Sequence, residues 1–123
     1  MLFTEILKDN KAFMKCFRQG RFISCDYITV YFIPNKTAYN RMGISVGKKN
    51  GCAVERNRIK RIIRAAYRLN EHKFPIGYDI VFAARKGIND KKSSDIEKFI
   101  NNKLLKNMTE KKSDKNKYVK KNK

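Results

Sequence analysis

Residues 47–68 read GKKNGCAVERNRIKRIIRAAYR, and this stretch organises the interpretation of the whole chain. Its second half places apolar residues at the spacing of one helical face, namely Ile59, Ile62, Ile63 and Ala66. Its first half is a polar loop with two glycines and two lysines. The pattern therefore predicts an amphipathic helix over residues 54–69 that follows a basic loop.

The same stretch is strongly cationic. Between Lys48 and Arg68 there are eight lysines and arginines and a single acid, Glu55. Like charges one turn apart destabilise an isolated helix by a few tenths of a kcal/mol per pair. A phosphate partner would reverse that effect, and the planar fork of arginine binds phosphate bidentately. The candidate phosphate-binding residues are Lys48, Lys49, Arg56, Asn57, Arg58, Lys60, Arg61, Arg64 and Arg68.

The alternative for this helix is an ordinary solvated face. Solvated helices usually interleave charges of both signs, and acids are nearly absent here. The net charge of the whole chain, +19 over 123 residues, points the same way. Such self-repulsion favours a polyanionic partner. A need for general solubility or binding to an anionic membrane surface would also account for that charge.

Upstream of the basic loop, the pattern predicts one helix and two strands. The helix covers residues 10–19, with Asn10 as its N-cap and Gly20 as its stop. A strand is expected over residues 22–33 and a second over 41–46, joined as an antiparallel hairpin. In the first strand Ile28, Val30 and Phe32 share one face, and Tyr31 lies on the other.

Downstream of the basic helix, residues 78–84 read YDIVFAA and predict a strand buried on both sides. A last helix begins at Ser93 or Ser94, and its buried side is expected to consist of Ile96, Phe99, Ile100, Leu104 and Leu105. The order α-β-β-α-β-α predicts an α+β sandwich with one small mixed sheet and helices packed mostly on one side. If strand 78–84 runs parallel to an earlier strand, helix 54–69 is the crossover.

The size of the chain fits one domain, expected over residues 1–108. Residues 109–123 are rich in lysine and carry no hydrophobic pattern, so a disordered basic tail is expected there. The apolar stretch Met1–Leu7 is too short for a signal peptide and includes Glu5. No apolar run approaches the ~20 residues that span a bilayer, so no membrane role is expected for the folded part.

Catalytic and metal chemistry finds little support in the sequence. Cys16, Cys25 and Cys52 form no CxxC pair, and His72 is the single histidine, so neither a zinc site nor a disulfide framework is predicted. Reduced thiols fit a cytoplasmic protein. The acids Asp26, Asp79 and Asp90 are scattered without the spacing of a nuclease metal site. We assign no catalytic residue and no metal ligand to the chain.

Residues 47–68, with Arg56-Asn57-Arg58 followed by Ile59-Lys60-Arg61, resemble the signature of bacterial ribonuclease P protein subunits. The resemblance extends over roughly residues 8–108. It includes Phe13 and Phe17 before Gly20, the strand through Tyr31, the segment Gly43-Ile44-Ser45-Val46, and Ala84-Arg85-Lys86. Gly47 stands where the family pattern has serine, and Cys52 where it has asparagine. Both departures concern the loop before the basic helix and the detail of its contacts.

The resemblance implies an accessory subunit of an enzyme whose catalyst is RNA. The expected fold is an α–β sandwich with a left-handed βαβ crossover, against the usual hand. The basic helix and its preceding loop would bind the catalytic RNA, giving a 1:1 ribonucleoprotein that matures the 5′ end of tRNA. A cleft between the sheet and the first helix would bind the 5′ leader of precursor tRNA through Phe13, Phe17 and Tyr31. Mg²⁺ is expected for the holoenzyme rather than for the protein.

The residues themselves leave alternatives open. Aromatic side chains beside a basic groove suit single-stranded nucleic acid, because stacking tolerates any base. Phe13 and Phe17 would equally serve as core packing between helix and sheet. A structural RNA-binding protein of ribosomal type is the alternative function, and a protein nuclease ranks behind it.

Overall fold

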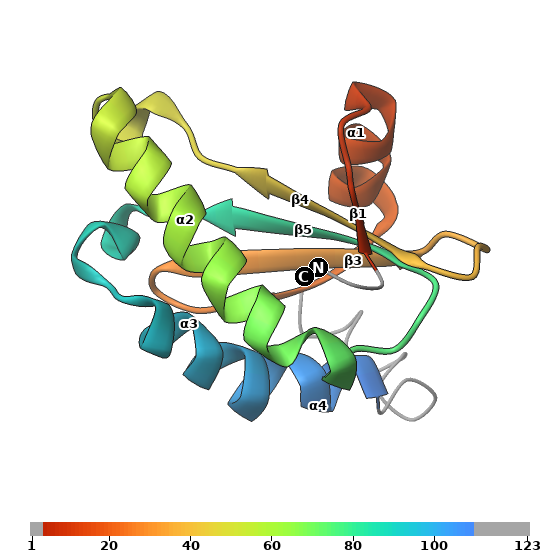
Figure 1. The fold of residues 1–123 in the computed structure, drawn as a ribbon. Coiled ribbons are helices and arrows are strands. Elements are labelled where there is room, and N and C mark those ends of the chain that lie inside the picture. Colours follow the sequence, from red (N-terminus) through yellow and green to blue (C-terminus); the bar gives the residue numbers. More distant parts are fainter. Residues whose placement is uncertain (1–3, 110–123) are drawn as a thin grey trace.

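The computed structural model describes residues 4–109, which form one five-stranded mixed sheet with helices on both faces (Figure 1). The strands are β1 (Thr4–Ile6), β2 (Arg21–Ser24), β3 (Ile28–Pro34), β4 (Asn40–Ser45) and β5 (Tyr78–Ala84), in the spatial order β1-β4-β5-β3-β2. The main helices are α1 (Asn10–Gln19), α2 (Ala53–Asn70) and α3 (Ser93–Phe99). The predicted α+β architecture is confirmed.

Strand β5 lies in the middle of the sheet. It pairs antiparallel with β3, from Ile28 opposite Ala84 to Pro34 opposite Tyr78, and parallel with β4. All of its seven residues except Asp79 are apolar, and side chains on both faces of the strand are buried, as the sequence predicts. The expected hairpin between β3 and β4 is wrong, because β5 lies between these two strands; they are antiparallel in direction but are not neighbours.

Helix α2 connects the parallel strands β4 and β5. Figure 1 shows both strands pointing the same way, with α2 in front of the sheet and β5 below β4. Turned so that the strands point upward, this view has β5 to the left of β4, which makes the crossover left-handed. This is the rare hand for a βαβ unit.

The larger core lies between the sheet and the layer of α2 and α3. It brings Ile28, Val30 and Phe32 of β3 together with Ile59 and Ile63 of α2. Helix α3 continues through a π-helical segment, η4 (Ile100–Leu104), into α4 (Leu105–Thr109). Its buried side is as predicted, with additional burial of Met108, and consists of Ile96, Phe99, Ile100, Leu104, Leu105 and Met108.

Helix α1 packs on the opposite face of the sheet. The smaller core there contains Leu7, Cys16 and Val81, with Phe13 and Phe17 packed against it half-buried. The sheet therefore has an α2 face, covered by α2 and α3, and an α1 face, where α1 packs beside Tyr31 and Ile33.

Two strand predictions need correction. The expected strand over residues 22–33 is a hairpin of β2 and β3, closed by a hydrogen bond from Cys25 N to Ile28 O. Strand β1 was not predicted at all. It pairs parallel with β4, and Thr4 Oγ1 fixes it by donating to Glu71 Oε2 at 2.6 Å and bonding the Tyr67 hydroxyl at 2.8 Å.

Helix ends also differ in detail from the prediction. Helix α1 begins at Asn10, but the capping side chain is Asp9, which accepts from Lys11 N at 3.0 Å. At the start of α3, Asp95 Oδ2 accepts from Lys92 N, so the capping carboxylate lies inside the helix rather than at a serine before it. Both arrangements place a negative charge near the positive end of the helix dipole.

The expected basic tail, residues 109–123, lies outside the described residues except for Thr109 at the end of α4. The prediction of one domain over residues 1–108 stays a prediction. Within residues 4–109, no helix is long and apolar enough to cross a membrane.

Candidate nucleic-acid interface

The cationic side of α2 lies opposite its buried side. Ile59, Ile63 and Ala66 are fully buried, whereas Arg61, Arg64 and Arg68 are exposed. None of these three arginines has a hydrogen bond or ion pair to another described residue. Their guanidinium groups are thus available to an external anion. We call the nine predicted cationic and polar positions the arginine surface: Lys48, Lys49, Arg56, Asn57, Arg58, Lys60, Arg61, Arg64 and Arg68.

The loop before α2 continues this surface. Lys48 and Lys49 are exposed in the short helix η1 (Lys48–Asn50), and Asn57 is exposed in the first turns of α2. Cys52 occupies the N-cap position of α2, where the backbone N–H groups of Glu55 and Val54 lower the pKa of its exposed thiol. The loop and the helix therefore form one continuous basic element.

Three members of the arginine surface are partly covered. Lys60 and Arg56 are half-buried, and Arg56 Nε has no hydrogen-bond partner among the described residues. Arg58 is engaged within the protein, because its guanidinium donates to the carbonyl oxygens of Asn89 and Lys91. The sequence did not predict this contact.

A cluster of aromatic side chains lies on the α1 face. Its members are half-buried and in contact: Phe13–Phe17 with ring centroids 6.2 Å apart, Phe17–Tyr31 edge-to-face at 4.9 Å, and Tyr31–Phe22 at 5.5 Å. We call Phe13, Phe17, Phe22 and Tyr31 the aromatic cluster. The structure thus brings together the three predicted residues and adds Phe22, which faces Tyr31 across the β2–β3 pair.

The position of Phe13 depends on a glycine in β4. A Cβ atom at Gly43 would lie 2.5 Å from Phe13 Cζ, so any larger residue there must displace the ring. Next to this contact is a pocket of about 130 Å³, lined by Phe13, Met42, Ile44, Lys60 and Arg64 among others. The aromatic cluster and the arginine surface therefore meet at the edge of the sheet formed by β1 and β4.

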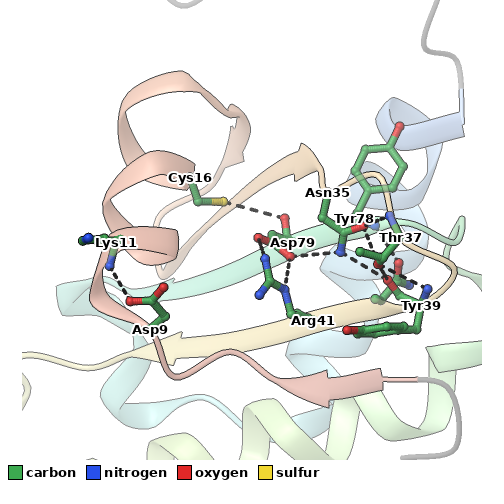
Figure 2. A network of polar contacts seen from close by, with 10 residues as sticks. Asp9, Lys11, Cys16, Asn35, Thr37, Tyr39, Arg41, Tyr78 and Asp79 are labelled. Atoms are coloured by element: carbon green, nitrogen blue, oxygen red, sulfur yellow. Dashed lines mark hydrogen bonds and ion pairs between the residues drawn. The ribbon is translucent and has the colours of Figure 1, made fainter.

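An ion pair fixes the far end of the α1 face (Figure 2). Arg41 Nε and Nη2 each donate to the Asp79 carboxylate at 2.8 Å, and Asn35 Nδ2 donates to it at 3.0 Å. Cys16 Sγ of α1 lies 3.7 Å from the Asp79 carbonyl oxygen. Burial, reinforced by the charge of Asp79, raises the pKa of the Cys16 thiol to about 12. The network fastens α1 and the turn at residues 35–39 to the start of β5.

The acids offer no metal site in the described part of the chain. Asp79 is used by Arg41, and Asp26 and Asp90 are exposed in separate turns. No group of three or more His, Cys, Asp or Glu residues within residues 4–109 could hold a metal ion. Within residues 4–109, the acids therefore do not form a cluster of Mg²⁺ ligands, and we assign the metal no role there.

Comparison with known sequences gives one consistent result. The sequence profile of the Ribonuclease P family matches residues 1–109. A ribonuclease P protein component from Clostridioides difficile is 45% identical over 100 residues, covering 80% of this chain and 88% of that protein. The corresponding protein of Pelotomaculum thermopropionicum is 41% identical over 96 residues, covering 78% of this chain and 86% of its own length.

Solved structures agree with this result. The RNase P protein of Staphylococcus aureus superimposes with a TM-score of 0.74 at 30% identity, covering 84% of this chain and 95% of that one. The RNase P protein of Thermotoga maritima gives a TM-score of 0.73 at 33% identity, covering 83% and 96%.

Proposed function

This chain belongs to the ribonuclease P protein family, and from that premise we propose which of its surfaces bind which RNA. It is the protein subunit of an endoribonuclease that matures the 5′ end of tRNA, its partner is ribonuclease P RNA, and catalysis belongs to the RNA. The proposal concerns the contact residues, the precursor tRNA leader and a 1:1 stoichiometry.

The arginine surface is the proposed contact with ribonuclease P RNA. The observation that carries this assignment is the row of exposed arginines without internal partners on α2, namely Arg61, Arg64 and Arg68. Cations held near one another without carboxylates repel, and RNA phosphates relieve that repulsion. Lys48 and Lys49 extend the contact into the preceding loop.

The aromatic cluster is the proposed contact with the 5′ leader of precursor tRNA. A leader is single-stranded, and half-exposed rings on a rigid sheet provide stacking platforms for its bases. Beside Tyr31 and Phe22, the next register row of the sheet holds small side chains, which leave room for a nucleotide chain; they are Ser24, Thr29, Ala83 and Ser45. Phe13 and Phe17 also pack against Cys16 and Val81, so their rings serve the core as well.

The relative position of the two surfaces suits one protein bound to one RNA and one substrate. They converge at the pocket that Phe13 shares with Lys60 and Arg64. A leader lying over the aromatic cluster would therefore run alongside the catalytic RNA bound to α2. The protein would act by holding the substrate's leader next to its catalyst.

Reconstitution tests the function. The full chain is added to its cognate ribonuclease P RNA at near-physiological magnesium, and cleavage of a precursor tRNA with a 5′ leader is measured. We expect the protein to increase the cleavage rate. Unchanged cleavage, together with co-purification of ribosomal RNA alone, would instead indicate a structural RNA-binding protein.

A further inference from the structure

Three sets of contacts hold the segment that follows β5, residues 85–92: one to α2, one to the loop before α2, and one to the hairpin of β2 and β3. We call this segment the basic turn; it contains the short helix η3 (Lys86–Asp90). We infer that the basic turn is an additional phosphate-binding element for the RNA bound by α2, and that Arg58 is the residue that positions it. This inference rests on the proposed function of the arginine surface.

The first set of contacts comes from Arg58. Its Nη1 donates to Lys91 O at 3.2 Å, and its Nη2 donates to the carbonyls of both Asn89 and Lys91. These carbonyls lie at and just after the end of η3, where backbone acceptors lack helical partners. A planar guanidinium can bridge the two carbonyls, whereas an ammonium acts as a point charge.

The second set joins the basic turn to the loop that carries Lys48 and Lys49. Asn50 Nδ2 donates to Arg85 O at 3.1 Å and to Asn89 Oδ1 at 3.3 Å, and Asn89 Nδ2 donates to Asn50 O at 2.7 Å. Asn50 is 1% exposed. A buried asparagine exchanging hydrogen bonds with a partner 39 residues away fixes the two loops against each other.

The third set comes from Tyr27, in the turn between β2 and β3. Lys91 Nζ sits 5.0 Å from the centre of the Tyr27 ring, and the Tyr27 hydroxyl donates to Asp95 O at 3.0 Å. The hairpin between β2 and β3 therefore also supports the turn.

The charges that this scaffold presents are mainly positive. Lys86 and Lys92 are exposed, and neither side chain has a partner among the described residues. Asp90 is the one acid within the turn, against Arg85, Lys86, Lys91 and Lys92. Because Asn50 joins the turn to η1, the segment that carries these lysines adjoins the loop that carries Lys48 and Lys49. We infer that it extends the basic surface past α2. Rigid placement lowers the entropy lost when lysines bind phosphate.

Two features separate positioning by Arg58 from direct binding. Its Nη atoms are occupied by carbonyls, unlike the free guanidinium groups of Arg61 and Arg64. Its acceptors also belong to the backbone of the very segment that carries Lys86 and Lys92. Its contribution to RNA binding should therefore depend on those two lysines.

The experiment measures equilibrium binding of the full chain to ribonuclease P RNA over a range of salt concentrations. Lys86→Ala/Lys92→Ala should reduce the slope of log K against log salt by about two and weaken binding about tenfold at physiological salt. The control Lys98→Ala/Lys103→Ala removes the same charge from exposed positions of α3 and η4. It should change the salt slope and the affinity only slightly. Arg58→Lys keeps the charge but loses the planar guanidinium that bridges the two carbonyls. It should therefore weaken RNA binding about as much as Lys86→Ala/Lys92→Ala does.

A double-mutant cycle completes the test. In the Arg58→Lys background, Lys86→Ala/Lys92→Ala should cost much less affinity than in the wild-type chain. Equal costs in both backgrounds, or full binding by Arg58→Lys, would overturn the positioning role. If Lys86→Ala/Lys92→Ala has the same RNA affinity and salt slope as the control Lys98→Ala/Lys103→Ala, the basic turn is not a binding element. Arg61→Ala/Arg64→Ala separates the failures: if it loses affinity while the turn variant does not, the proposed function stands and this inference falls.

Discussion

Arg41 and Asp79 are register partners on the parallel strands β4 and β5, and two hydrogen bonds of 2.8 Å join their side chains. The Asp79 side chain is 6% exposed and that of Arg41 33%. The pair ties two strands that are far apart in sequence, and through Asn35 it also holds the turn beyond β3. Its loss should loosen the end of the α1 face rather than either RNA contact directly.

Arg41→Met should lower the free energy of unfolding by about 2–3 kcal/mol, because it leaves the Asp79 carboxylate buried without a cation. Urea denaturation measures this change. Arg18→Met, an exposed position on α1, should alter stability by less than about 0.5 kcal/mol. Equal effects of the two substitutions would show that the ion pair contributes nothing.

Gly43→Ala should destabilise the protein by about 1–3 kcal/mol, because the new methyl group overlaps the Phe13 ring. Part of the loss should be recovered when Phe13→Leu is added, which urea denaturation of the single and double variants would reveal. Gly47→Ala is the control, since no atom lies within 4 Å of its Cβ position. If the losses in unfolding free energy caused by Gly43→Ala and Phe13→Leu simply add, the contact between these two positions is contradicted.

Stability should fall at alkaline pH partly because of Cys16. Its pKa rises from 9.0 to about 12 on folding, so its contribution is full below pH 9 and is lost as pH rises toward 12. Between pH 8 and 10 the loss should be about 1 kcal/mol. Urea denaturation at both values measures it, and Cys16→Ala should reduce the difference. A variant with the unchanged pH dependence would exclude Cys16 as its source.

Tyr31→Leu should weaken binding of precursor tRNA to the holoenzyme by about 1–3 kcal/mol and leave binding of mature tRNA unchanged, because a leader base loses its stacking partner. Affinities for the two RNAs give the comparison. Tyr39→Leu, at another half-exposed tyrosine, serves as the control. If Tyr31→Leu lowers stability but not leader affinity, the ring has a packing role only.

Arg61→Ala should reduce the salt dependence of binding to ribonuclease P RNA by about one in log–log slope, because one phosphate contact is lost. Stability should stay within about 0.5 kcal/mol, since Arg61 is exposed without internal partners. An unchanged slope, in binding assays that detect the wild-type dependence, would remove this side of α2 from the interface.

The elements with a strong repeating pattern were predictable. Strand β5 matches the predicted residues 78–84, since an apolar run bounded by Gly77 and Arg85 fits few alternatives. Helix α2 was predictable because its 3.6-residue period continues over several turns. The observed helix extends one residue beyond the predicted range at each end. The same period placed Arg61, Arg64 and Arg68 on the exposed side.

Long-range pairing was not predictable in the same way. The hairpin of β3 with β4 was expected because neighbours in sequence often pair, yet β5 binds both. The turn at residues 25–27 contains neither glycine nor proline, so residues 22–33 were interpreted as one strand instead of β2 and β3. The partners of Arg58 are backbone carbonyls more than 30 residues away. Because every residue has a backbone carbonyl, the sequence does not indicate which one accepts the hydrogen bond.

The central position of β5 also constrains the order in which the protein is made. Strands β1, β2, β3 and β4 all precede it in the chain, yet β3 and β4 reach each other only through it. During synthesis the ribosome therefore releases two strands with open edges before their shared partner exists, and such edges are prone to aggregate. The nascent chain, already strongly basic, must pass through this stage before residues 78–84 emerge and close the sheet.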